Sequence, residues 1–189
     1  MLRISLVIAI AIFLGSASVI QAQDVAQKTR ELTASLDKTK HKKKEKKGFS
    51  FETYVDVKNT PATRSDPSLY SGIYKAEGYV LDLKVAKNGT VEGTGSDQML
   101  NNGREAKFTL RNARVEGALL TAIKEYADGE ARKFEAVFVE RTVVQGKSPD
   151  AIESTEKAFG LGWVEGGSVV AGSNVQAEWT SRVFLERVK

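Results

Sequence analysis

Residues 79–93 read YVLDLKVAKNGTVEG, and this stretch decides the fold class. Every second residue from Tyr79 to Val85 is apolar, whereas Asp82 and Lys84 lie between them. A period of two is typical of a β-strand with one buried face. Asn88-Gly89 follows at once, and this pair favours a type I′ hairpin turn because both residues tolerate positive φ. The stretch therefore predicts an antiparallel hairpin.

The same kind of turn signal recurs along the chain. Asn102-Gly103, Glu116-Gly117 and Asp128-Gly129 follow Asn88-Gly89 at intervals of 14, 14 and 12 residues. Short strands at even spacing indicate an all-β fold, an antiparallel up-and-down meander of about eight to ten strands that closes into a barrel or half-barrel. Two runs between the turns predict single strand faces, namely Leu119, Thr121 and Ile123, and then Phe134, Ala136 and Phe138.

Two further segments flank this meander. Apolar or β-branched residues alternate from Phe49 to Val57, which predicts a strand at the start of the folded domain. Ser148-Pro149-Asp150 is followed by early acids and by Lys157. Proline in the first turn with acids early and lysine late is typical of a short helix, so we expect one helix in a loop near 149–158.

The first 22 residues predict a secretory signal peptide. Arg3 precedes an apolar run from Ile4 to Leu14, and small residues follow as far as Ala22. The run is shorter than the roughly 20 residues needed to span a bilayer. We expect cleavage after Ala22, with Ser18 as the alternative, and a periplasmic or secreted protein with no transmembrane segment after cleavage.

Residues 23–47 are polar and strongly charged, which predicts a basic stalk, disordered or a frayed helix, ahead of a β domain at 48–189. Seven lysines against Glu45 give residues 38–47 a charge of +6. Because the whole chain carries a formal +4, the remainder carries −2. The basic character of the protein therefore belongs to this segment and not to the β domain.

The lysine run has two open interpretations. One is a surface anchor that binds an anionic envelope surface, and the other is a solvated spacer kept extended by self-repulsion. A nucleic-acid partner is not expected, because the segment lacks interleaved aromatic residues and follows an export signal. The candidate anchor residues are Lys42, Lys43, Lys44, Lys46 and Lys47.

Several kinds of chemistry are excluded by residue counts. The chain has no cysteine and one histidine, His41. Disulfides, thiolate catalysis and a multi-histidine metal site therefore cannot form. A Ser-His-Asp triad is not expected either, because the single histidine lies inside the lysine run. We expect no enzyme activity, no cofactor and no metal. A pair of facing carboxylates, as in a glycosidase, stays open as an alternative, with Glu92, Asp97, Glu116 and Glu135 as candidates.

The two ends of the β domain carry a family resemblance. Tyr70-Ser-Gly72-Ile-Tyr74 resembles the opening of lipocalin-like (calycin-type) barrels, in which an aromatic residue stands two positions after a glycine. Ser181 to Leu185 looks like their closing strand, where an arginine, here Arg182, often packs near the opening aromatic residue. The chain departs from the pattern, because Tyr74 replaces the usual tryptophan and Phe184 stands where the fatty-acid-binding branch tends to have tyrosine. The resemblance implies a barrel and suggests an apolar ligand inside it.

Two functions follow as hypotheses. The first is a binding module whose interior holds a small apolar or amphipathic ligand, with Arg182 as the anchor for an anionic head group. The alternative is a structural or interaction domain of the cell envelope, in which the same aromatic residues form a packed core. The candidate ligand-binding residues are Tyr74, Tyr79, Phe108, Phe134, Phe138, Trp163, Trp179 and Arg182.

Overall fold

The computed structural model describes residues 22–46, 49–97, 105–171 and 174–188, and most of them are antiparallel β-strand. A helix at residues 22–35 comes first. The strands and a single 3-10 helix follow as β1 (Lys38–Lys46), β2 (Phe49–Pro61), η1 (Pro67–Tyr70), β3 (Gly72–Ala76), β4 (Tyr79–Val85), β5 (Val91–Asp97), β6 (Ala106–Glu116), β7 (Leu119–Tyr126), β8 (Ala131–Ser148), β9 (Ala151–Ala171) and β10 (Asn174–Val188).

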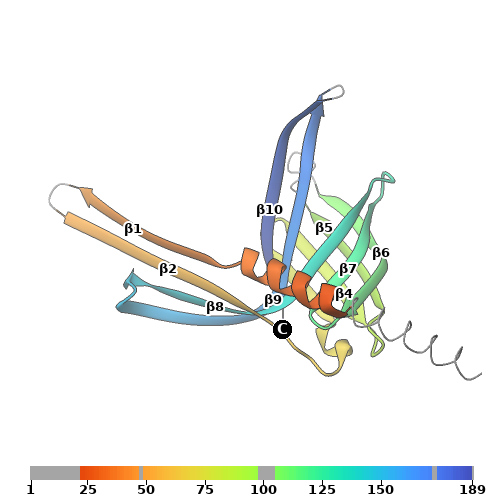
Figure 1. The fold of residues 1–189 in the computed structure, drawn as a ribbon, viewed down its shortest axis with the longest axis horizontal. Helices are drawn as coiled ribbons and strands as arrows, with labels where there is room; N and C mark the ends of the chain where they lie inside the picture. The colour runs from red at the N-terminus through yellow and green to blue at the C-terminus, as the bar shows by residue number, and fades with distance from the viewer. Residues whose placement is uncertain (1–21, 47–48, 98–104, 172–173, 189) are drawn as a thin grey trace, which may run out of the picture.

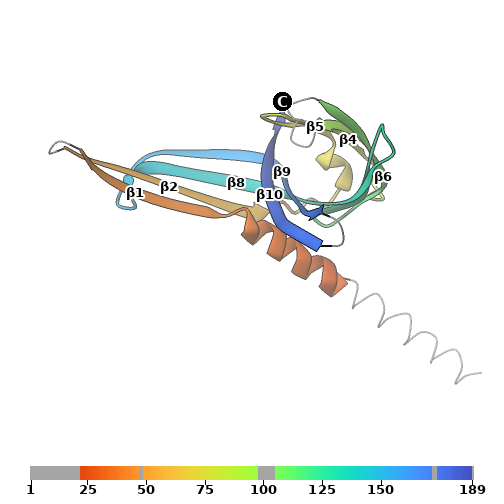
Figure 2. The same ribbon diagram turned by 90° about the horizontal axis from the view of Figure 1, so that it is seen from above.

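The strands of the described residues form one ten-stranded sheet in a ring-like arrangement. Neighbouring strands pair in the order β1-β2-β8-β7-β6-β5-β4-β3-β10-β9, and an additional pairing joins β8 to β9. The pairings from β3 to β10 therefore run in a circuit, as the view from above in Figure 2 shows. The expected all-β antiparallel class and the meander from β3 to β8 are confirmed.

A long arm extends from the ring (Figure 1). The first half of β8 pairs with β7 as far as Val137, and from Val139 onward β8 pairs with β2 instead. The start of β9 pairs with the far half of β8, and β1 pairs along β2. The arm is thus a four-stranded sheet in the order β1-β2-β8-β9. Its two edge segments, Lys38–Glu45 and Ala151–Lys157, are exposed at every residue, so both faces meet solvent.

The hairpin around Asn88-Gly89 is confirmed, but its turn differs from the expected type. The backbone N–H of Gly89 donates to the carbonyl of Ala86 at 2.9 Å, and Gly89 alone in this turn has positive φ, at 84°. This is a type I turn that ends in a left-handed glycine, the usual form of the longer hairpin loops. Turns at Gly117 and Gly129 are confirmed, with φ of 62° and 89°. Asn102-Gly103 lies outside the described residues.

The face of β7 was predicted one residue out of register. The face expected from Leu119, Thr121 and Ile123 points outward, where Thr121 and Ile123 are half-exposed. The interior face consists instead of Leu120, Ala122, Lys124 and Tyr126, all buried. Lys124 belongs to this row, and its charge made the row look solvent-facing in the sequence. In β8 the expected face of Phe134, Ala136 and Phe138 is confirmed.

The prediction of a helix near 149–158 is wrong. Pro149 and Asp150 form the turn between β8 and β9, and residues from Ala151 onward pair with the end of β8. Proline followed by aspartate favours a tight turn as well as a helix start. Pairing with β8 decides between the two, because it satisfies the backbone of both strands.

The prediction for residues 23–47, a disordered segment or a frayed helix, agrees with the structure in its helical first part and differs from it over 38–46. Residues 22–35 form a helix that packs on the sheet, and 38–46 form β1. Val25, Thr29, Leu32, Thr33 and Leu36 form one helical stripe, and Thr29, Thr33 and Leu36 are buried. Two threonines in place of large apolar residues hid this stripe. The folded unit therefore begins before residue 48.

Leu36 attaches this segment to the ring. Its side chain occupies the space that a Cβ on Gly162 of β9 would take. Glu135, Val137 and Val139 share the outward face of β8, and Lys28 of the helix bonds Glu135 at 2.5 Å. Both valines on that outward face are 0% exposed. The helix therefore covers an apolar strip outside the ring.

We expect Leu36→Ala to lower the free energy of unfolding by about 2 to 5 kcal/mol, because it removes a buried side chain and leaves a cavity. Urea unfolding checks this value. Leu69→Ala is the matched control at a position 52% exposed, where the change should stay within about 0.5 kcal/mol. Equal, small effects of the two variants would contradict the packed position of Leu36.

Candidate functional site

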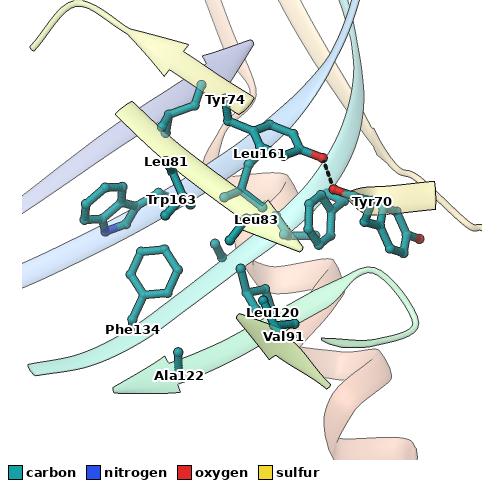
Figure 3. Packing of buried hydrophobic residues seen from close by; sticks show 14 of the residues in the cluster. Tyr70, Tyr74, Leu81, Leu83, Val91, Leu120, Ala122, Phe134, Leu161 and Trp163 are labelled. Atoms are coloured by element: carbon teal, nitrogen blue, oxygen red, sulfur yellow. Dashed lines mark hydrogen bonds between the residues drawn. The ribbon is translucent and has the colours of Figure 1, made fainter. Parts of the chain in front are cut away.

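The predicted ligand-binding aromatic residues lie in the interior of the ring, packed against one another (Figure 3). Tyr79, Phe108 and Phe134 surround Trp163, with ring centroids 5.4, 6.1 and 4.8 Å from that of the indole. None of the four side chains is more than 6% exposed. These residues fill the space that an apolar ligand would need.

Tyr74 and Phe138 form a second group with Tyr70 toward η1. The rings of Tyr70 and Phe138 stack with centroids 4.2 Å apart, and the hydroxyl of Tyr74 donates to the carbonyl of Tyr70 at 2.5 Å (Figure 3). Burial raises the pKa of Tyr74, so its hydroxyl stays protonated and donates. The side chain of Trp179 lies outside the described residues, although its backbone belongs to β10.

Glycines in β5 allow this dense interior. A Cβ on Gly93 would meet Leu83 and Leu110, and one on Gly95 would meet the ring of Phe108. Large side chains from β4 and β6 therefore reach over β5 into the ring.

A cavity of about 720 Å³ lies outside the ring, on the outward side of β4 to β7. Asp82, Ser96 and Lys107 are among the residues that line it.

Arg182 does not lie beside the opening aromatic residue. It pairs with Val164 in the register of β10 and β9, and its side chain is exposed on the outside. The arginine at the opening motif is Arg187, which pairs with Tyr74 and donates to the carbonyls of Leu69 and Ser71 at 3.1 and 2.6 Å. The arginine beside Tyr74 is therefore Arg187, five residues after the expected Arg182.

Gly72 of the opening motif makes room for Arg187. A Cβ at Gly72 would meet the Nε of Arg187, and Gly72 has a φ of 151°. The guanidinium thus reaches both carbonyls at the end of η1 and joins the last strand to the first strand of the ring.

We expect Arg187→Gln to lower the free energy of unfolding by about 1.5 to 3 kcal/mol, because it removes charge-assisted hydrogen bonds to two carbonyls. Arg182→Gln makes the same charge change on the same strand at an exposed position and should cost less than about 0.5 kcal/mol. Urea unfolding of both variants checks the assignment. A larger loss in Arg182→Gln would overturn it.

A buried ion pair lies at one end of the interior. The Nζ of Lys124 contacts Oδ2 of Asp97 at 2.6 Å, both side chains are 1% exposed, and the hydroxyl of Tyr126 donates to the same oxygen at 2.7 Å. The ammonium also lies 4.0 Å from the centroid of Trp163 and 4.6 Å from that of Phe108. These rings stabilise the cation by cation–π attraction. Sequence reasoning missed Lys124 because the face of β7 was misassigned.

We expect Asp97→Asn to lower the free energy of unfolding by about 3 to 5 kcal/mol, because it removes the negative charge of Asp97 beside the buried ammonium of Lys124. The double variant Asp97→Leu, Lys124→Met should recover part of that loss, since neither charge is then buried. Asp82→Asn, an exposed position on β4, is the matched control. Thermal and urea unfolding measure all three, and a neutral Asp97→Asn would contradict the role of the pair.

The four candidate carboxylates do not share one face. Asp97 points into the ring, whereas Glu92 is exposed. Glu135 lies on the outside between Lys28 and Lys133, at 2.5 and 2.7 Å. Glu116 forms an ion pair with Arg114 at 2.9 Å. This arrangement does not place two acids on opposite sides of one cleft, as glycoside hydrolysis requires.

The lysines of β1 form an ordered row on the arm. Lys38, Lys40, Lys42 and Lys44 occupy alternate positions of the strand, so they share one face, and each is exposed. Their partners in β2 include Thr53, Val55 and Val57. Residues directly opposite in an antiparallel pair lie on the same face, so the lysine row runs beside an apolar row. We call this surface the basic face.

The opposite face of the arm has paired charges. Lys43 contacts Glu52 at 3.2 Å, Thr39 donates to Asp56, and Lys58 lies 4.0 Å from Asp56. Among the described residues, no carboxylate lies within ion-pair distance of the four lysines of the basic face. The predicted anchor residues therefore divide between the faces, with Lys42 and Lys44 on the basic face and Lys43 on the other. Lys47 and the side chain of Lys46 lie outside the described residues.

Like charges on the basic face affect one another. The pKa of Lys40 is lowered by Lys38, first because the neutral amine of Lys40 can accept a hydrogen bond from the Lys38 ammonium, and then because the two positive charges repel each other. The face is therefore a concentration of positive charge that an anionic partner would relieve.

No protein-family model matches the chain, and no match is found among the curated proteins or the solved structures. The likeness to lipocalin-like barrels therefore stays a prediction. Within the described part of the chain, no helix is both long and apolar enough to cross a membrane.

Proposed function

We propose that the protein is a non-catalytic docking domain of the cell envelope that places the basic face of its arm on an anionic lipid surface. The row of exposed lysines at Lys38, Lys40, Lys42 and Lys44 carries this proposal. Alternate residues of a strand are about 6.5 to 7 Å apart, so the four lysines are spaced regularly along one face of β1. An extended row of like charges fits an extended anionic surface better than a single small ligand.

The apolar row beside the lysines supports a lipid surface. Val55 and Val57 of β2 and Val143 of β8 lie next to one another by register and are half-exposed. Interfacial protein segments combine such an apolar strip with lysines, because the strip enters the head-group region while the cations bind anionic lipids. Each lysine near such a surface contributes about 1 kcal/mol.

The ring acts in this proposal as a solid base. Its described aromatic side chains pack against one another, which supports the alternative of an interaction domain more than a ligand carrier. We infer that the ring is an eight-stranded lipocalin-like barrel, since small barrels of that size are filled by their own side chains. The circuit of pairings from β3 to β10 and the contact of Arg187 with the opening segment support this fold.

The test is cosedimentation of the exported chain with lipid vesicles. We expect binding to vesicles that contain phosphatidylglycerol, no binding to pure phosphatidylcholine, and loss of binding at high salt because exposed charges are then screened. Replacing Lys40, Lys42 and Lys44 by glutamine should weaken binding about 100-fold, from three contributions of about 1 kcal/mol.

The matched control replaces Lys75, Lys84 and Lys107 by glutamine, which removes the same charge from exposed positions on the ring. This control should bind like the unchanged protein. Equal losses in both triple variants would show a net-charge effect and overturn the basic face as the docking surface. Binding to a soluble acidic polymer as tight as to vesicles would overturn the lipid assignment.

A further inference from the structure

A cavity of about 530 Å³ lies where the arm meets the ring. Three cationic side chains line it, Lys38 from β1, Arg141 from β8 and Arg182 from β10. Asp37 is the acidic residue among its described lining, so the lining carries a net charge of about +2 at neutral pH. Lys38 belongs both to this cavity and to the basic face.

Arg141 is held in place within the cavity. Its guanidinium carbon lies 3.6 Å from the ring centroid of Phe184, and its Nε donates to Oδ1 of Asn59 at 2.9 Å. Burial lowers the pKa of Arg141 to about 10, with nearby Asp37 acting in the opposite direction, so the group is still charged at neutral pH. A half-buried cation with a fixed plane is prepared for an oxyanion.

The carboxylate of Asp37 is committed to other partners. Its Oδ1 accepts from the backbone N–H of Asn59 at 2.8 Å and from the side-chain amide at 2.9 Å. Among the described residues, no carboxylate lies within ion-pair distance of Arg141 or Arg182. Asn59 thus links Asp37 to Arg141 and orients both, while neither arginine has an ion-pair partner in the part of the chain that the structure describes.

The remaining wall of the cavity is mostly apolar, with Ser35 as its other polar residue. Leu36 follows the helix, Val57 lies on the basic face, and Phe184 supports Arg141. Cavities of a few hundred Å³ with apolar walls and a few convergent polar groups are typical of sites for small molecules. Here the polar groups are cationic, so the site selects an anion that also carries an apolar part.

We propose that this cavity binds the phosphate head group of a single anionic amphiphile, with the phosphate at Arg141 and Arg182 and the start of an acyl chain on Phe184 and Leu36. The site is continuous with the basic face through Lys38. The inference rests on the proposed function for the source of the ligand, which is the lipid surface on which the arm docks. The cavity adds a site for a single lipid molecule to the basic face, which by itself recognises only negative charge.

Calorimetric titration with dihexanoyl phosphatidylglycerol below its critical micelle concentration tests the site. We expect one molecule to bind per chain and Arg182→Gln to weaken binding about tenfold or more, because a charge-assisted hydrogen bond is lost. Arg111→Gln is the matched control, since it removes the same charge from an exposed position on β6. Unchanged affinity in Arg182→Gln, or an equal loss in Arg111→Gln, would overturn the site.

Two further probes separate the sources of the ligand. Dihexanoyl phosphatidylcholine should bind weakly, and equal binding would overturn selection for a net anion. Inorganic phosphate should also bind weakly, because it cannot use the apolar wall. Equal affinity for inorganic phosphate would make the cavity a free-phosphate site and overturn the amphiphile.

The triple variant of Lys40, Lys42 and Lys44 separates this inference from the proposed function. It leaves the cavity intact, so it should bind the short-chain lipid normally while losing vesicle binding. Short-chain lipid binding without any vesicle binding in the unchanged protein would overturn the docking function and leave the cavity site standing. Vesicle binding without short-chain lipid binding would overturn the cavity site and leave the docking function standing.

Discussion

Backbone hydrogen bonding along β8 sets the shape of the molecule. This strand has 18 residues and its neighbour β7 has 8, so most of β8 cannot pair within the ring. Unpaired backbone groups in a strand favour a new partner, and β2 takes that position from Val139 onward. The arm follows from this change of partner, because β2 brings β1 with it and β9 runs along the other side of β8. The lysines of the basic face alternate along β1 because β1 belongs to this sheet.

The ring and the arm solve opposite packing problems. In the ring, the glycines of β5 have no side chain, and this leaves space for Leu83, Leu110 and Phe108 in the interior. The arm has no second layer among the described residues, and both of its faces meet solvent along β1 and the start of β9. Stability therefore resides in the ring and the helix that covers it, while the arm depends on strand pairing and is available for contact. Lys124 and Asp97 introduce the one buried ion pair among the described residues into an otherwise apolar interior.

The sequence predicted the regular parts of the fold and failed where partners distant in the chain decide. Alternation from Tyr79 to Val85 and glycines with positive φ are local signals, and both predicted structure correctly. Ser148-Pro149-Asp150 has local signals for a helix and for a turn, and only the pairing of β9 with β8 distinguishes them. The basic residues of the candidate site were visible as a lysine run. Their division between two faces depends on the register of β1 with β2, which composition does not contain. The cavity at the base of the arm combines residues from β1, β8 and β10, so no motif could have indicated it.

Lysines on an edge strand also discourage the pairing of that edge with another copy of the same protein. The outer side of β1 has no partner strand among the described residues, and an open strand edge is a template for joining another sheet. Two copies that met along β1 would bring rows of ammonium groups together, which opposes the pairing. The lysines on which the proposed docking function rests thus also discourage the growth of extended sheets from this exposed edge.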